Sequence, residues 1–267
     1  MVSKSELNVP ITRSKGRTYT VKDYIVALQR LGIKRGDTIC VHSQIYSLGI
    51  PLCGKEQLLN YYCKILKESV GQSGTLIMPT FSYSFCNNEV YDIQHTPSSV
   101  GILTEHFRKY PGAQRTKHPI FSFAVLGPRE EEFLDISWDA FDKEESVYGK
   151  LLRSDDSIVL FGAHKGYTFY YLSEQYVGVK HRYFKNFSGT IIDNNRGEQY
   201  TQTVPYFVRH LDMRSIEDQR RVDQYLIQAG VLEGVEISGG SISRFHCKDA
   251  FQECTKKIME NESYFLL

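Results

Sequence analysis

The sequence predicts an α/β protein whose layered central β-sheet is flanked by helices. Short apolar runs typical of strands alternate with amphipathic segments of helical spacing along most of the 267 residues. Turns that contain glycine or proline separate these segments. Between about 180 and 208 the pattern changes to two β-runs joined by an Asn/Gly turn, which indicates an inserted β-hairpin. Because no linker, repeat or low-complexity tract divides the chain, we predict a single domain over 1–267.

Helix and strand patterns alternate regularly in the first half of the chain. Apolar residues between Tyr24 and Leu31 recur at helical spacing, and Gly32 follows as a stop signal. The segments that follow are predicted from the same periodicities and from their turn residues. In order they are a strand in TICVHS, a helix in LLNYYCKILKESV, a strand in TLIMPTF and a helix in VGILTEHFRKY that ends before Pro111.

The second half continues this alternation and closes with a helix. FSFAVLG and SIVLFGA are short apolar runs and are predicted to be buried strands. The second of them leads into a predicted helix, TFYYLSEQYVG. After the hairpin, residues 238–241 are expected to form a Gly/Ser loop, and residues 248–259 a final helix.

Composition and charge exclude several classes of protein. The chain is 41% hydrophobic and 24% charged, with 32 Lys+Arg against 31 Asp+Glu, so its net charge is +1. A neutral chain has no global field for nucleic acid or for a polycationic substrate. It has no signal-peptide pattern and no run of about 18 apolar residues, and its six cysteines form no CxxC pair. We therefore expect a cytoplasmic protein with reduced thiols and no membrane insertion.

The common motifs of cofactor and metal chemistry are absent. The sequence contains no GxGxxG, GxxxxGK[ST], HExxH or GxSxG motif, and its eight histidines show no paired metal spacing. We therefore predict no metal site. The basic block KHRYFKNF interleaves cations with aromatics, as in single-strand nucleic-acid binders, but its period of two is equally typical of an amphipathic strand. We predict no nucleic-acid partner.

Six blocks in sequence order resemble the aminoglycoside 3-N-acetyltransferase family, the antibiotic N-acetyltransferases that do not have the GNAT fold. They cover practically the whole chain. The blocks are GIKRGDTICVHSQIYSLG, GTLIMPTFSYSF, the run from YDIQHTPSSVG to HPIFSFAVLG, YGKLLRSDDSIVLFGA, TFYYLSEQYVGVKHRYFKNFSG and the closing RFHCKDAFQE to ESYFLL. The resemblance implies an antibiotic N-acetyltransferase-like α/β fold and transfer of an acetyl group from acetyl-CoA to an amine of a sugar-like substrate.

The resemblance also implies a set of residues that bind the cofactor and the acceptor. His42, Ser43 and Ser47 follow a predicted strand, where they would meet acetyl-CoA, although such hydroxyls equally cap helices. The HPxxS element places His118, a candidate base, and Ser122 beside the cofactor. Arg115, just before this element, would contact a phosphate of the cofactor. Asp92 lies where the family has an Asp-Pro segment at the mouth of the substrate site, and it is equally suited to capping a turn.

The sequence departs from the family at the catalytic pair. The family shows His-x-x-Glu on the helix after SIVLFGA, and the two side chains share a face at this spacing. Here Glu174 is present, but the histidine position is Tyr171. A phenol with an ordinary pKa of about 10 is a poor base at neutral pH, whereas imidazole, at about 6.5, is well suited. Three alternatives stay open: Glu174 is the base, a nearby histidine (His118 or His164) is the base, or the chain binds without catalysing transfer.

We therefore expect an acetyl-CoA-dependent N-acyltransferase that acetylates an amino sugar. Because an aminoglycoside site should carry excess acid, the charge of +1 favours a nucleotide-linked amino sugar from polysaccharide biosynthesis as the acceptor. The alternatives are a non-catalytic CoA- or sugar-binding homologue and a true aminoglycoside 3-N-acetyltransferase. A homodimer is compatible with the sequence, which does not fix the oligomeric state.

Overall fold

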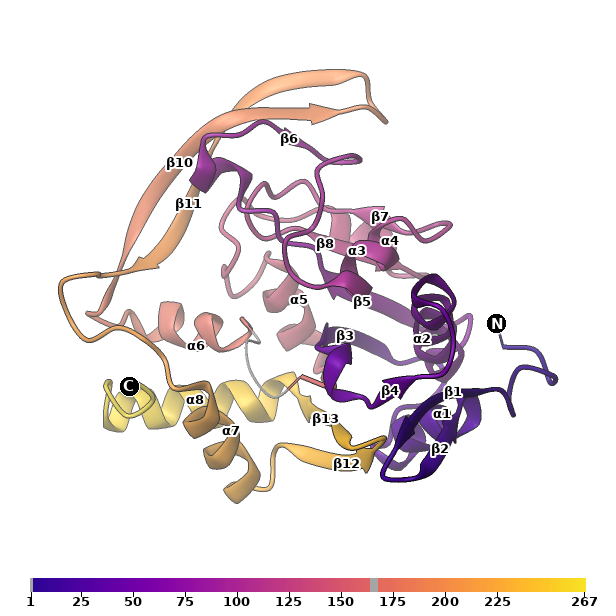
Figure 1. Ribbon diagram of the computed structural model, residues 1–267. Coiled ribbons are helices and arrows are strands. Elements are labelled where there is room, and N and C mark those ends of the chain that lie inside the picture. Colours follow the sequence, from indigo (N-terminus) through magenta and orange to yellow (C-terminus); the bar gives the residue numbers. More distant parts are fainter. Residues whose placement is uncertain (1, 164–167) are drawn as a thin grey trace.

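A mixed β-sheet forms the centre of the protein, and helices lie on both of its faces (Figure 1). The computed structural model describes residues 2–163 and 168–267. Within these residues the largest sheet has the order β12-β13-β9-β3-β5-β8-β7. Its middle strands β9, β3 and β5 run parallel, and the outer pairs are antiparallel. The seven strands are β3 (Thr38–Ser43), β5 (Thr75–Pro79), β7 (Gln114–Arg115), β8 (Phe123–Leu126), β9 (Ser157–Phe161), β12 (Glu233–Ile237) and β13 (Gly240–His246).

Two hydrophobic clusters, one on each face of this sheet, make the molecule layered. Successive side chains of a strand point to opposite faces, so Ile39 and Val41 of β3 enter one cluster and Cys40 enters the other. Every residue of β5 and of β9 is buried, as expected for strands covered on both faces. The predicted class, a layered α/β sheet flanked by helices, is confirmed.

Each face of the sheet has its own set of helices. The first cluster contains side chains from α1 (Val21–Arg30), α2 (Lys55–Val70) and α3 (Ile102–Arg108). α1 begins at a capping box between Thr20 and Asp23 and ends at Arg30. Gly32 follows the C-cap residue, and its φ of +77° suits the predicted stop. The second cluster is covered by α4 (Glu130–Leu134), α5 (Val147–Ser154), α6 (Tyr170–Val177), α7 (Gln219–Gln228) and α8 (Cys247–Glu260).

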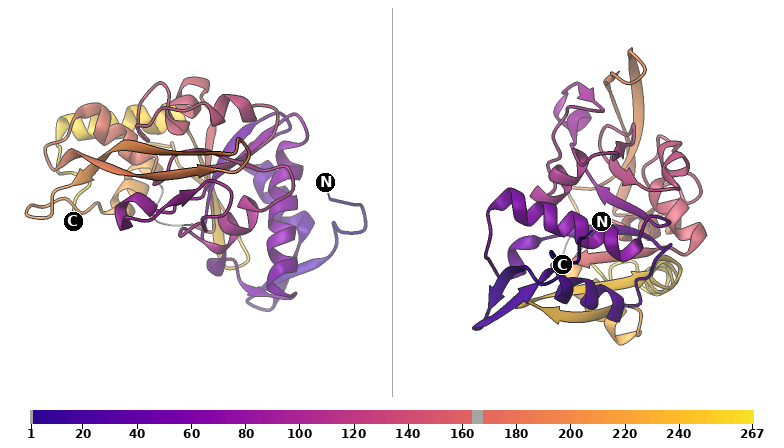
Figure 2. Two further views of the ribbon diagram at one scale, coloured as in Figure 1. Left: turned by 90° about the horizontal axis from the view of Figure 1, so that it is seen from above. Right: turned by 90° about the vertical axis from the view of Figure 1, so that its right-hand side faces the viewer.

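A long two-stranded hairpin extends from this core (Figures 1 and 2). Strands β10 (Arg182–Asp193) and β11 (Glu198–Arg209) pair along their whole length, in the region where the sequence predicts the inserted hairpin. Near its tip, β10 pairs in parallel with the short β6 (Tyr91–Asp92). Gly189 leaves room for Phe85, since a Cβ atom there would lie 2.7 Å from the phenyl ring. The hairpin is thus held against the loop that follows β5.

Several elements were not predicted from the sequence. A small N-terminal sheet joins β1 (Pro10–Ser14), β2 (Arg17–Thr20) and β4 (Ile50–Pro51). The segment 238–241 is not simply a loop, because Ser238 and Gly239 form the tight turn between β12 and β13 and Gly240 already begins a strand. Helices α4, α5 and α7 were also missed. Two 3₁₀ turns complete the described elements, η1 (Ile45–Ser47) and η2 (Ser84–Asn87).

All six cysteines are free thiols. None of the helices in the described part of the chain has both the length and the apolar character that crossing a membrane requires.

Candidate active site

The first candidate cavity opens at the carboxyl ends of the parallel strands. It has a volume of about 240 Å³ and lies between the end of β3, the segment after β5, and the residues that precede α3 and α6. In open α/β sheets, ligands bind at this edge, where the chain leaves to opposite sides of neighbouring strands. Here α2, which follows β3, packs on one face of the sheet, and α6, which follows the neighbouring β9, packs on the other, so the edge between these strands is such a point. His42, Ser43, Gln44, Pro79, Phe81, Tyr83, Val100, Gly101, Thr104 and Thr168 line this cavity.

Two of the residues predicted to bind the cofactor, His42 and Ser43, line the first cavity. His42 is buried, and its Nε2 lies 3.2 Å from the Tyr148 hydroxyl, which also contacts the Thr168 hydroxyl. Burial raises the pKa of Tyr148 well above its ordinary value, so this phenol stays protonated at neutral pH. A hydrogen-bonded chain therefore connects β3 to the start of α6. Ser43 contributes to the cavity wall beside Gly101.

Ser47 lies in the 3₁₀ turn η1 and does not line the first cavity. Its hydroxyl donates to the Gln44 carbonyl at 3.0 Å and to the Gly162 carbonyl at 2.6 Å. The turn is packed against Gly162 so closely that a Cβ atom there would lie 2.7 Å from both Gln44 O and Ser47 Oγ. In this structure Ser47 holds the turn in place beside the end of β9. Its contact with the cofactor stays a prediction.

Arg115 and Ser122 lie beneath the loop that follows β5. The buried guanidinium of Arg115 donates to the Thr80 carbonyl at 2.6 Å and to the Ser122 hydroxyl at 3.1 Å. Ser122 in turn donates to the same Thr80 carbonyl at 2.7 Å. Both side chains therefore brace this loop, and neither lines the first cavity. Arg115 lines a separate pocket of about 690 Å³ together with Lys117 and Arg196. The predicted contacts of Arg115 and Ser122 with the cofactor stay predictions.

Asp92 caps a turn and connects it to the tip of the hairpin. Its Oδ1 accepts the backbone amides of Gln94 and His95, both at 2.9 Å, and its Oδ2 accepts the Asn194 side-chain amide at 2.8 Å. These bonds match the capping alternative described for this residue. The acceptor-binding role stays a prediction.

His118 is fully buried, and both of its ring nitrogens have partners. Nδ1 accepts the backbone amides of Ile120 and Phe121, at 3.2 and 3.0 Å, so Nε2 carries the proton and donates to the Trp138 carbonyl at 3.1 Å. Burial lowers the pKa of His118 to about 4. No lone pair is left to receive a proton from an acceptor, so this geometry favours a structural role. The other histidine considered as a base, His164, lies outside the described residues.

The buried state of His118 predicts a specific acid sensitivity. Between about pH 6.5 and pH 4 an unfolded histidine binds a proton that the folded one refuses, so stability is lost as the pH falls through this window. The loss from this group is about 3 kcal/mol. His118→Asn keeps an oxygen that can accept both amides but cannot titrate. We expect urea unfolding at about pH 7 and pH 4.5 to show a smaller drop in the variant. Equal drops would contradict a neutral buried imidazole.

The second candidate cavity lies at the base of the hairpin and contains Tyr171. Its volume is about 310 Å³. The Tyr171 hydroxyl donates to Glu217 Oε1, and the guanidinium of Arg182 lies over the phenol ring, 4.2 Å from its centre. Burial and then the charge of Glu217 raise the pKa of Tyr171 well above its ordinary value, so it is protonated at neutral pH. The lining residues are Tyr171, Arg182, Tyr183, Lys185, Phe187, Tyr206, Val208, Arg209, Leu211 and Glu217.

Glu174 lies behind this cavity in a buried ionic network. It has no exposed surface, its Oε1 is 2.9 Å from His181 Nε2, and its Oε2 is 2.5 Å from Arg182 Nε. The second contact is an ion pair without an aligned hydrogen bond. Nδ1 of His181 faces the half-buried Glu262 at 3.4 Å. Glu174 lines neither cavity, so it is suited to positioning His181 and Arg182.

The two cavities adjoin through an aromatic wall and the start of α6. Tyr83 lines the first cavity and Tyr206 the second, and both rings pack edge-on against Phe121, with centroids 5.7 and 4.8 Å away. Thr168 contributes to the first cavity and Tyr171, one helical turn later, to the second. The Phe121 ring therefore separates the two cavities at this wall, and the start of α6 borders both of them.

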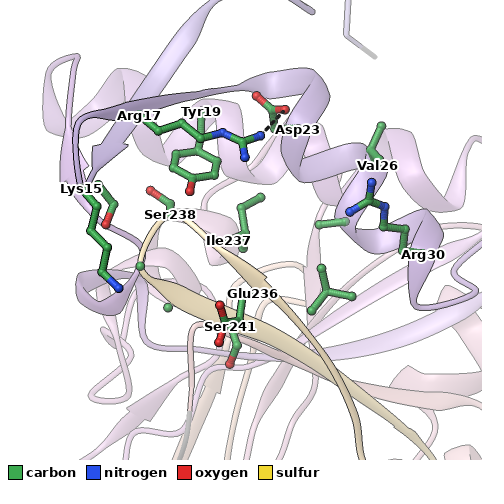
Figure 3. Close-up of a pocket in the computed structure, with 15 residues that line it drawn as sticks. Lys15, Arg17, Tyr19, Asp23, Val26, Arg30, Glu236, Ile237, Ser238 and Ser241 are labelled. Carbon is green, nitrogen blue, oxygen red and sulfur yellow. Dashed lines mark ion pairs between the residues drawn. The ribbon is translucent and has the colours of Figure 1, made fainter.

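A third pocket, of about 540 Å³, lies between the N-terminal sheet, α1 and the β12–β13 turn (Figure 3). It contains none of the predicted site residues. The pocket is lined by the cationic side chains of Lys15, Arg17 and Arg30, and Arg17 also pairs with Asp23 at 3.9 Å. Its floor adjoins η1, because a Cβ atom at Gly240 would lie 2.5 Å from the Ser47 carbonyl. Across the described residues, no three His, Cys, Asp or Glu side chains are grouped as metal ligands.

Three residues at or behind the second cavity were not predicted from the sequence as site residues. His181 and Arg182 belong to the basic block that was interpreted only as an amphipathic strand or a nucleic-acid contact. Their position seven and eight residues after Glu174, across the end of a helix, was the available signal. Glu217 is 46 residues from Tyr171 and carries no motif, so no local pattern marks it.

Comparisons with known proteins point to one family. The sequence model described as Aminoglycoside 3-N-acetyltransferase matches residues 40–260. The SPbeta prophage-derived aminoglycoside N(3')-acetyltransferase-like protein YokD of Bacillus subtilis (strain 168) is 28% identical over 159 residues, which are 51% of this chain and 57% of that protein. Aminoglycoside N(3)-acetyltransferase IX of Micromonospora chalcea is 27% identical over 174 residues, 58% of each chain. Both matches span little more than half the length of the relative.

A solved structure shows the same fold. AAC-IIIb in its binary complex with CoASH superposes with a TM-score of 0.75 at 17% identity, covering 91% of this chain and 97% of that one.

Proposed function

The chain belongs to the aminoglycoside 3-N-acetyltransferase family, and we propose that it transfers the acetyl group of acetyl-CoA to the amino group of an amino sugar. The observation that carries this proposal is the pair of adjoining cavities. One is lined by His42 and Ser43 at the carboxyl end of β3, and the other holds Tyr171 and Glu217. The names of the relatives and the CoASH-bound neighbour support the reaction class.

In this proposal acetyl-CoA approaches from the first cavity and the acceptor from the second. The amine and the thioester carbon must then come within about 3.5 Å of each other beside the start of α6, which borders both cavities. The amine attacks the thioester carbon and loses a proton, the carbonyl oxygen becomes an oxyanion, and the thiolate of CoA leaves. The hydroxyl of Ser43 is a donor on the cavity wall that suits the oxyanion. No covalent enzyme intermediate is needed, because a thiolate is a good leaving group.

We assign the base to Glu217, which takes the place left by the missing histidine. The Tyr171 hydroxyl donates to Oε1 and fixes the carboxylate. Oε2 lies 3.7 Å from Arg182 Nη2, beyond hydrogen-bond reach, and remains available to the amine. The side chain of Glu217 is 17% exposed within the cavity, whereas that of Glu174 is fully buried. Tyr171 and Glu174 are then positioning residues, the first for Glu217 and the second for Arg182.

The phosphates of CoA require cations that the first cavity lacks. Its described lining contains no lysine or arginine. The third pocket adjoins η1 and is lined by three cations, Lys15, Arg17 and Arg30, beside the β12–β13 turn (Figure 3). Two acids also line it, Asp23, which pairs with Arg17, and Glu236. Lysine and arginine side chains suit phosphate oxygens. We therefore place the phosphates of CoA in this pocket, with the pantetheine arm passing η1.

CoA is expected to raise the melting temperature of the protein. A ligand at about 100 times its Kd stabilises the folded state by about 2.7 kcal/mol. Ser43→Ala should reduce the shift by weakening contacts in the first cavity, and Lys15→Gln by removing a phosphate contact. Thermal melts with and without CoA measure both effects.

The matched control is Lys22→Gln, which removes a lysine of α1 that lies outside the third pocket. It should leave the shift unchanged. If millimolar CoA shifts no melting temperature, the proposed function fails. If Lys15→Gln behaves like Lys22→Gln, the phosphates bind elsewhere.

The acceptor is proposed only as an amino sugar. The Micromonospora chalcea relative is named as an aminoglycoside N(3)-acetyltransferase, and aminoglycosides contain amino sugars. No comparison supports the nucleotide-linked acceptor expected from the charge of the chain. Nothing in the comparisons favours a non-catalytic homologue.

A further inference from the structure

We propose that the second cavity binds an anionic group, a phosphate or a carboxylate, carried by the acceptor amino sugar. This inference rests on the proposed function and specifies its acceptor. Lys185 and Arg209 hold the anion, and Glu217 receives the amine of the same molecule. The acceptor is thus a small amino sugar that carries both a positively charged amine and an anionic group. It differs from a polycationic aminoglycoside.

The pairing register of the hairpin brings Lys185 to the wall of this cavity. Side chains of directly paired residues lie on the same face of a sheet. Lys185 pairs with Tyr206, and Tyr183 pairs with Val208, so these four side chains share the face that lines the cavity. Arg209 pairs with Arg182 at the base of the hairpin, where both side chains also line the cavity although they alternate with Tyr183 and Val208 along the strands.

The charges of the lining residues are unequal. Three cations line the cavity, Arg182, Lys185 and Arg209, and Glu217 is the one acid among the described lining residues. Arg182 is already compensated, since it pairs with Glu174 at 2.5 Å and approaches Glu217 at 3.7 Å. Among the described residues, neither Lys185 nor Arg209 has a carboxylate within 4.0 Å, and Lys185 only lies 5.0 Å from the ring of Phe187. Two uncompensated cations therefore lie beside the Tyr171–Glu217 pair.

This charge pattern selects against a polycation. Several ammonium groups in so small a site would be repelled by Lys185 and Arg209, and one carboxylate cannot compensate them. A phosphate or carboxylate forms charge-assisted hydrogen bonds with the same two side chains, and Arg209 can present two parallel N–H donors. A cavity of about 310 Å³ is at the small end of ligand sites and fits a monosaccharide. The rings of Tyr206 and Phe187 supply an apolar wall for the sugar.

Calorimetric titration with two sugars that differ by one phosphate tests this inference. Glucosamine 6-phosphate and glucosamine are titrated into the protein, with and without CoA, and kanamycin is titrated in parallel. We expect the phosphorylated sugar to bind at least about tenfold more tightly than glucosamine and kanamycin, with an affinity that falls as salt is added. The double variant Lys185→Gln/Arg209→Gln should lose this advantage. Lys185→Arg/Arg209→Lys, which keeps both charges, should retain most of it.

Lys180→Gln is the matched control, because it removes a cation of the same basic block that does not line the cavity. It should bind like the wild type. Equal binding of the two glucosamines, tighter binding of kanamycin, no saturable binding of the sugar phosphate, or an unchanged advantage in the double variant would each overturn the inference. The CoA-induced melting shift is recorded on the same samples. If this shift is present but phosphate selectivity is absent, only the acceptor assignment fails, whereas loss of the shift rejects the proposed function.

Discussion

Glu217→Gln is expected to lower kcat by about 100-fold or more, the usual effect of removing a general base. The amide keeps the size of the side chain and still accepts the Tyr171 hydroxyl, but it cannot take a proton from the amine. The CoA-induced melting shift should be unchanged, because Glu217 lines only the acceptor cavity. Tyr171→Phe should cause a smaller loss, since it removes the group that fixes the carboxylate and leaves the carboxylate itself. Initial rates of CoA-thiol release measure both variants.

Asp212→Asn is the matched control for this experiment. Asp212 is an exposed acid near the same end of the hairpin, it faces His210, and it does not line the acceptor cavity. Its removal should leave kcat within about twofold of the wild type, as expected for a screened surface charge. If Glu217→Gln is as active as Asp212→Asn, the base is another group. His164, which is outside the described residues, is then the first to test.

Glu174→Ala is expected to lower the free energy of unfolding by roughly 3 kcal/mol, because it leaves the buried Arg182 with only the more distant Glu217, at 3.7 Å, as a counter-charge. Arg182 also loses its fixed position over the Tyr171 ring, so kcat should fall in the fraction that remains folded. The cause is structural and differs from that in Glu217→Gln. Urea denaturation measures the first effect, and the rate per folded molecule measures the second.

Glu262→Ala provides the comparison for the buried network. Glu262 is half-buried and faces the other nitrogen of His181 at 3.4 Å, so its loss should cost less than about 1 kcal/mol. If Glu174→Ala and Glu262→Ala destabilise the protein equally, Glu174 does not hold the network together.

The strands and helices of the core were predictable because they are buried in a simple way. β3, β5 and β9 are short apolar runs, and α2 and α8 are long amphipathic segments, so their periodicities are clear. The N-terminal sheet, β12 and β13 were not predictable in the same way. β12 is half-exposed with the sequence EGVEI, and its apolar alternation is too weak to separate it from a loop.

The candidate site was only partly predictable for a related reason. His42 and Ser43 lie directly after a strand, so a strand prediction places them at the edge where ligands bind. His118 and Ser122 belong to a motif that Arg115 precedes, but in the structure these side chains bond to backbone groups. His118 accepts an amide of its own loop, whereas Arg115 and Ser122 donate to the Thr80 carbonyl in the loop after β5. Glu217 and Arg209 reach the site only through the hairpin and the segment after it. Contacts between residues so far apart in sequence depend on tertiary structure, and no local pattern reveals them.

The most direct test of the account is acetyl-CoA turnover by the wild-type protein. CoA-thiol release is followed with a panel of amino sugars that includes glucosamine, glucosamine 6-phosphate and kanamycin. Release without acceptor is subtracted, and the N-acetylated product is identified by mass spectrometry. We expect acceptor-dependent release with at least one amino sugar, abolished in Glu217→Gln. A wild-type protein that is stabilised by CoA but acetylates none of the panel would contradict this account and indicate a binding homologue without transferase activity.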